Sequence, residues 1–144
     1  MIQDDTVKLL KECNAGIKMG VTTIEEVLDK VESKKFKQLL SECVQQHQSL
    51  GSETHRLLNQ YHDSGKEPNP MAKGMSWLKT NVKLSFDRND QSIANLVTDG
   101  CYMGVKSLSR YLNQYEAAEE QAKNIAKKLI ALEQDLTENI RQFL

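Results

Sequence analysis

Apolar residues recur at alternating three- and four-residue steps along four stretches of this 144-residue chain. Such spacing gathers the apolar side chains on one face of an α-helix, because a helix has 3.6 residues per turn. A short glycine-containing segment, which we call the glycine phrase, occurs twice in the chain. Its residues Gly16, Met19, Gly20 and Val21 match Gly100, Met103, Gly104 and Val105, which lie 84 positions later. The pattern predicts an all-α helical bundle built from two related helix pairs.

The periodic stretches and the residues between them predict five helices in a single domain. Their approximate ranges are 5–31, 34–63, 70–86, 91–113 and 116–143. Ser33 is the expected N-cap of the second helix and Asp90 that of the fourth. The first two helices are separated by only a few residues, as are the last two, so each couple must form an antiparallel pair.

The stretch between the second and fourth long helices is too long for a simple loop. A 30-residue helix is about 45 Å long, and a helix of about 16 residues with some ten extended residues covers that distance. We therefore expect a ferritin-like four-helix bundle, in which two antiparallel hairpins are joined by a long crossover that contains the short helix.

The repeated glycines need a reason, because glycine costs about 1 kcal/mol relative to alanine inside a helix. We expect close backbone packing, or room for a large side chain such as Trp77, Tyr102 or Tyr111. Space for a small apolar ligand between the hairpins is the alternative. Asn14 and Thr54 are expected to lie at the same height along the first hairpin. This polar pair in an otherwise apolar seam is expected to fix the helix register.

Composition and charge argue against several classes of function. Nineteen basic and twenty acidic residues leave a net charge of −1, which gives nucleic-acid binding little electrostatic support. No apolar stretch approaches the roughly 20 residues of a membrane span. Three widely spaced cysteines and no visible secretion signal favour a reducing, cytoplasmic location. We therefore expect neither a nucleic-acid nor a membrane partner.

Several short segments resemble those of uncharacterised bacterial ferritin-like four-helix-bundle domains, distant relatives of ferritins and rubrerythrins. The matching segments are 13–20 in the first helix, 64–68 leading to 75–79 in the connector, and Asp99-Gly100 in the fourth helix. The resemblance covers nearly the whole chain. It implies the bundle fold and, for this branch, no established activity.

The chain departs from the di-iron pattern of the wider ferritin superfamily. That pattern needs a Glu on each of two helices and Glu-x-x-His on each of the other two, so that carboxylate and imidazole reach the same metal. Val44, Ser52 and Asn59 stand three residues before the three histidines. All three histidines fall on the second helix, so a standard di-iron centre is not expected.

A weaker metal site has four candidate ligands: Cys43, His47, Asp99 and Glu133. Cys43 and His47 are four residues apart on one helix face, and both types ligate zinc or iron. Cys13 is expected level with residue 54 and hence far from Cys43. The simpler interpretation is a buried thiol and a hydrogen-bonded core histidine, with no metal or other cofactor.

No phosphate-binding loop, nucleophile elbow or Cys-x-x-Cys motif occurs in the sequence, so we do not expect an enzyme. The favoured hypothesis is a non-catalytic bundle that acts through a protein partner or by self-association as a homo-oligomer. Its candidate contact residues are aromatic or methionine, types that concentrate at interfaces: Met75, Trp77, Tyr102, Tyr111 and Tyr115. The alternative is a metal-binding or redox bundle with an atypical mononuclear or degenerate site.

Overall fold

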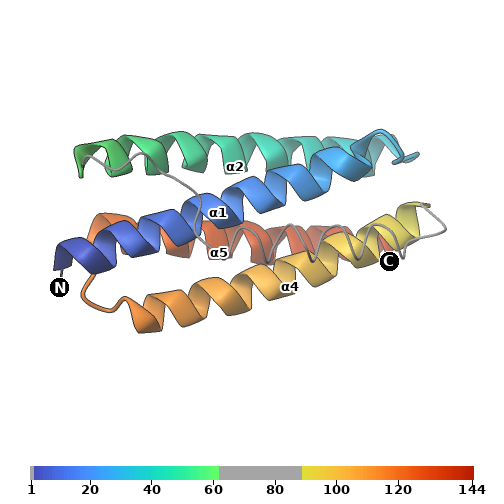
Figure 1. Cartoon of the computed structure of the whole chain (residues 1–144). Helices are drawn as coiled ribbons and strands as arrows, with labels where there is room; N and C mark the ends of the chain where they lie inside the picture. The colour runs from blue at the N-terminus through green and yellow to red at the C-terminus, as the bar shows by residue number, and fades with distance from the viewer. Residues whose placement is uncertain (1, 62–88) are drawn as a thin grey trace.

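The computed structural model describes residues 2–61 and 89–144, which form four long α-helices, one short 3₁₀ turn and no strand. The helices are α1 (Ile2–Leu28), α2 (Lys34–Gln60), α4 (Asp90–Gln114) and α5 (Glu120–Ile140), followed by η1 (Arg141–Phe143). They lie side by side along one axis as a bundle (Figure 1). The all-α prediction is confirmed for these residues. The predicted helix over 70–86 lies outside them.

The observed helix ends differ from the predicted ones by a few residues. α1 begins and ends about three residues early, because bonds from Lys30 N to Val27 O (3.0 Å) and from Val31 N to Leu28 O (3.3 Å) tighten its last turn. The last helix begins at Glu120 rather than 116. The predicted start at 116 is wrong because the preceding amides bind side chains of α1 instead.

One of the two predicted helix caps is confirmed and the other is wrong. Ser33 is the N-cap of α2, and its hydroxyl accepts from Phe36 N at 3.2 Å. Asn89, not Asp90, caps α4 by accepting from Ser92 N at 2.8 Å. Asp90 instead accepts hydrogen bonds from the backbone N–H groups of Glu32 (2.8 Å) and Ser33 (2.9 Å).

The two helix pairs bind each other's turns in the same way. Asp90, at the start of α4, binds the turn between α1 and α2. Asp5 and Thr6, at the start of α1, bind the turn between α4 and α5, accepting from Ala117 N (3.1 Å) and Glu119 N (2.8 Å). The start of each of these helices therefore lies at the end of the other, so α1 and α4 run in opposite directions (Figure 1).

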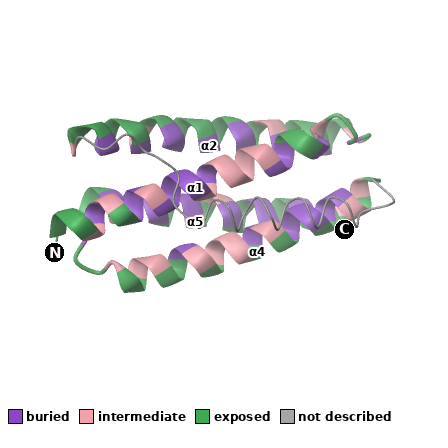
Figure 2. Cartoon of the chain, in the orientation of Figure 1, coloured by how far each residue is buried: buried purple, intermediate pink, exposed green. Residues whose placement is uncertain are grey.

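Buried residues line the inner faces of the helices (Figure 2), and the apolar ones among them form two clusters along the bundle. The first-turn cluster surrounds the turn between α1 and α2 and includes Ile24, Phe36, Leu40, Ile93, Cys101, Leu136 and Ile140. The second-turn cluster surrounds the turn between α4 and α5 and includes Leu9, Cys13, Ile17, Leu50, Leu108, Ala122, Ile125 and Leu129. Polar side chains are buried between the two clusters, at the middle of the bundle.

The predicted level of Asn14 and Thr54 agrees with the register of the first helix pair. A Cβ added at Gly51 would lie 3.4 Å from Ile17 Cγ2, which sets Asn14 close to the level of Thr54. Both side chains are buried, and the Thr54 hydroxyl donates to Leu50 O at 2.7 Å. Their role in fixing the register stays a prediction.

Candidate functional site

The centre of the bundle is occupied by one residue from each helix: Gly20 of α1, His47 of α2, Gly104 of α4 and Glu133 of α5. We call these four residues the central layer. His47 is 2% exposed and Glu133 is 8% exposed. Each lies between members of the two apolar clusters on its own helix, so both polar side chains are buried and need partners within the protein.

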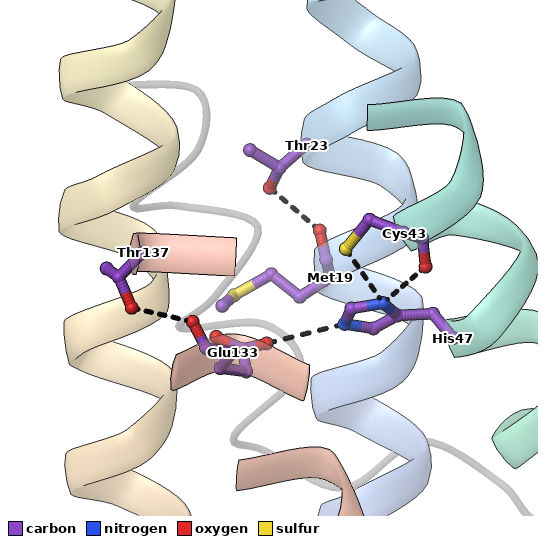
Figure 3. A network of polar contacts seen from close by, with 6 residues as sticks. All are labelled: Met19, Thr23, Cys43, His47, Glu133 and Thr137. Atoms are coloured by element: carbon purple, nitrogen blue, oxygen red, sulfur yellow. Dashed lines mark hydrogen bonds and ion pairs between the residues drawn. The ribbon is translucent and has the colours of Figure 1, made fainter. Parts of the chain in front are cut away.

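The imidazole of His47 contacts an acceptor on each edge (Figure 3). Its Nδ1 lies 2.8 Å from the carbonyl oxygen of Cys43, and its Nε2 lies 3.4 Å from Glu133 Oε1. Carbonyl and carboxylate oxygens accept but do not donate, so both nitrogens carry a proton. His47 and Glu133 therefore form a buried ion pair that joins α2 to α5.

The pKa of His47 is set by opposing effects. Burial by itself lowers that pKa, but hydrogen bonds to Cys43 and Glu133 outweigh burial and raise the pKa from 6.5 to about 10. The direction follows from the geometry, because both partners stabilise the protonated ring. His47 is consequently an imidazolium at neutral pH.

Two of the repeated glycines, Gly20 and Gly104, make room for this pair. A Cβ at Gly20 would lie 3.1 Å from the His47 ring, and a Cβ at Gly104 would lie 2.7 Å from Glu133 Oε2. Gly16 is different, since its added Cβ would meet Leu129 at an ordinary 3.7 Å. The second glycine of each phrase is thus the one that the ion pair requires.

Three of the four candidate ligands come together in the structure, and Asp99 does not. Cys43 Sγ lies 3.4 Å from His47 Nδ1, and Glu133 lies beyond the opposite ring edge. Asp99 is exposed on α4, and Gly104 occupies the level opposite Glu133. A single metal ion cannot reach both ring edges, and among the described residues no three such side chains are grouped to hold a metal.

Two of the three cysteines, Cys13 and Cys101, offer little nucleophilic chemistry. All three are free and buried. Burial, and next the charge of Glu12, raises the pKa of Cys13 to about 12. Burial, and next the charge of Glu133, raises the pKa of Cys101 well above its usual range. Both thiols therefore stay protonated at neutral pH, and a thiol is a much weaker nucleophile than a thiolate.

A cavity of about 30 Å³ adjoins the ion pair. Its wall includes Met19, Gly20 and Thr23 of α1 and Val97, Gly100 and Cys101 of α4, with His47 and Glu133 closing it from the other two helices. A pocket for an organic ligand is typically at least ten times larger. An apolar ligand above the glycines therefore does not fit this cavity.

Sequence reasoning placed His47 and Glu133 in one candidate site but did not predict that they pair directly with each other. The two residues are 86 positions apart, the same offset that separates the start of α2 at Lys34 from the start of α5 at Glu120. In an internally repeated chain, side chains one repeat apart occupy equivalent places and can meet near the axis that relates the repeats. The ion pair is such a meeting.

A second buried carboxylate, Glu12, was also missed. It is 9% exposed on α1, and burial raises its pKa even though Tyr111 and Arg110 of α4 lower it. One of its oxygens has no hydrogen-bond partner among the described residues. Glu12 thus contributes a destabilising charge to the contact between α1 and α4.

Comparison of the chain with protein-family models, with curated proteins and with solved structures gives no match. The described helices also include none with the length and hydropathy of a membrane span.

Proposed function

We propose that the protein is a non-catalytic helical bundle that acts through its surface, by self-association into a homo-oligomer. The observation that carries this proposal is the state of the central layer. His47 and Glu133 are each other's partners, and the cavity beside them is only about 30 Å³. The cavity beside the pair thus has no room for an organic substrate, which favours a function at the surface.

The outer face of α4 is the best-supported contact surface. Tyr102 is 60% exposed there, far more than the other tyrosines that the structure describes. Tyr111 and Tyr115 are partly buried and stack on each other with ring centroids 6.2 Å apart. Tyrosine is one of the residue types enriched among the anchors of protein interfaces. Trp77 and Met75 lie outside the described residues.

Sedimentation velocity over a wide concentration range tests self-association. The wild-type chain is expected to form a larger species whose share rises with concentration, and Tyr102→Ser is expected to weaken that association. Lys106→Ser, one turn further along the exposed face of α4, is the matched control and is expected to keep it. A wild-type protein that stays monomeric at every concentration would contradict the proposal.

The resemblance to ferritin-like domains is part of the same proposal. α2 ends and α4 begins at opposite ends of the bundle (Figure 1), which favours a long crossover between two antiparallel hairpins. Backbone chemical shifts measured by NMR for residues 70–86 test the short helix expected there. Extended-chain shifts throughout that range would count against the ferritin-like arrangement.

The metal-binding or redox alternative is less well supported. In its favour, Cys43, His47 and Glu133 are neighbours in the core. Against it, both nitrogens of His47 already have partners, the Cys43 carbonyl and Glu133, whereas a metal-bound nitrogen must be deprotonated and released from its partner. Binding would therefore require the ion pair to break.

A further inference from the structure

The cavity beside the ion pair has polar groups on one side and apolar groups on the other. His47 Nε2 and the Glu133 carboxylate face it from α2 and α5, and Ile24, Val97 and Leu136 complete its apolar wall. Convergent polar atoms in an otherwise apolar enclosure are the usual mark of a bound polar molecule.

The ion pair leaves hydrogen-bonding capacity unused. Its N···O distance is 3.4 Å, whereas charge-assisted N–H···O bonds are typically about 2.7–2.9 Å. A carboxylate has about four acceptor positions, and the contacts of Glu133 are with His47 and with the thiol of Cys101. A molecule that both donates and accepts would satisfy the carboxylate and the imidazolium together.

The volume of the cavity limits what this molecule is. A cavity of about 10–15 Å³, measured as the space for the centre of a water-sized probe, holds one water. The observed 30 Å³ therefore holds one or two waters, and nothing of the size of a metabolite. A small anion is also disfavoured, because Glu133 already balances the charge of His47.

The glycine phrases provide the way in. Met19, Gly20 and Gly100 line the cavity and are only partly buried, so the cavity reaches toward the surface between α1 and α4. A side chain at Gly20 would press on the His47 ring. Because glycine has no side chain, Gly20 and Gly100 leave solvent a short route to the central layer.

We propose that this cavity is a binding site for one or two water molecules that bridge His47 Nε2 and the carboxylate of Glu133. These waters complete the hydrogen bonds of the central layer and join the two helix pairs. They also give the buried ion pair a path for proton exchange with solvent, without unfolding.

An atomic-resolution crystal structure and NMR magnetisation transfer from water test the proposal together. In the wild-type protein we expect density within hydrogen-bonding distance of both His47 and Glu133, and rotating-frame cross-peaks between water and protons of the central layer. A cavity without water density, in which His47 and Glu133 are hydrogen-bonded directly to each other, would overturn the proposal.

Two variants separate bound water from general solvent exposure. Val97→Leu fills the cavity but keeps the ion pair, and His47→Leu with Glu133→Leu keeps the volume but removes the polar partners. We expect both to lose the cross-peaks at the Gly20 and Cys101 amides while retaining the helical circular dichroism of the wild type. Cross-peaks of wild-type intensity in both variants would contradict a bridging water site.

Discussion

At the scale of single residues, the arrangement around His47 depends on exact complementarity between buried polar groups. The ring is held on one edge by the carbonyl of its own helix and on the other by Glu133. Removing one member of such a pair leaves an unpaired buried charge, which costs more than the intact pair contributes. The pair is therefore better evidence for a specified register than for high stability.

Variants of the ion pair should be strongly non-additive. Glu133→Leu removes the partner that keeps the buried His47 ring protonated, so we expect a loss of about 3 kcal/mol or more in the free energy of unfolding. The double variant His47→Leu with Glu133→Leu is expected to recover much of that loss, because two apolar side chains replace the pair. Urea denaturation of the wild type, both single variants and the double variant measures the coupling. Additive losses would show that the two residues act independently.

The stability of the protein should fall at alkaline pH because of His47. Folding raises the pKa of His47 from 6.5 to about 10, so protonation favours the folded state. This contribution is complete below pH 6.5 and is lost as the pH rises through 10. We expect the free energy of unfolding to fall more steeply between pH 7 and 10 in the wild type than in the double leucine variant. Parallel curves would contradict a charged, buried His47.

At the scale of helices, the repeated glycine phrase has two distinct roles. Gly16 faces Leu129 with room for a methyl group, whereas Gly20 and Gly104 face the two members of the ion pair. Helix propensity alone would favour alanine at every one of these positions. The packing of the neighbouring helix decides which replacement is tolerated.

A short series of alanine variants tests this distinction. We expect Gly16→Ala to raise the free energy of unfolding by up to about 1 kcal/mol through helix propensity. Gly104→Ala should lower it by about 1–3 kcal/mol, because the new Cβ displaces Glu133 from His47. The change in the free energy of unfolding for Gly20→Ala should lie between those of Gly16→Ala and Gly104→Ala. Thermal or urea unfolding gives the order, and equal effects at Gly16 and Gly104 would refute the assignment.

The starts of α1 and α4 also do more than begin a helix. Asp5 with Thr6, and Asp90, bind amides in the turn of the opposite helix pair. The charged or hydroxyl side chains expected at a helix start are thus used for contacts between the pairs. This is why Asn89 takes over as the cap of α4.

At the scale of the whole molecule, the two helix pairs are related by equivalent contacts. Each first helix binds the turn of the other pair, and the second helices meet through His47 and Glu133, 86 residues apart. The apolar clusters are distributed in the same manner, one around each turn. A near-symmetric bundle of this kind follows from two related helix pairs packed face to face.

Metal analysis of the whole protein distinguishes the proposed function from its alternative. Protein purified without a histidine tag is expected to carry less than a tenth of an equivalent of any transition metal, because the nitrogens of His47 are both engaged. His47→Leu is the matched control and should give the same value. Stoichiometric zinc or iron that is lost in His47→Leu would favour the metal-binding alternative. It would also contradict the ion pair between a protonated His47 and Glu133.

The sequence by itself predicted the four helices that the structure describes and the burial of His47. These features follow from local periodicity and from short turns, which act over a few residues. It also pointed to Cys43, His47 and Glu133 as chemically interesting. Asp99 was included because it was expected at the level of Glu133, where the structure has Gly104 instead.

Only the tertiary structure decided which groups meet in the middle of the bundle. The contact between His47 and Glu133 joins residues of different helix pairs, and its geometry depends on how those pairs pack. The same packing assigns Gly20 and Gly104 to the ion pair and draws Asp90 to the first turn. Contacts between distant segments depend on the rotation and register of whole helices, which no local pattern in the chain specifies.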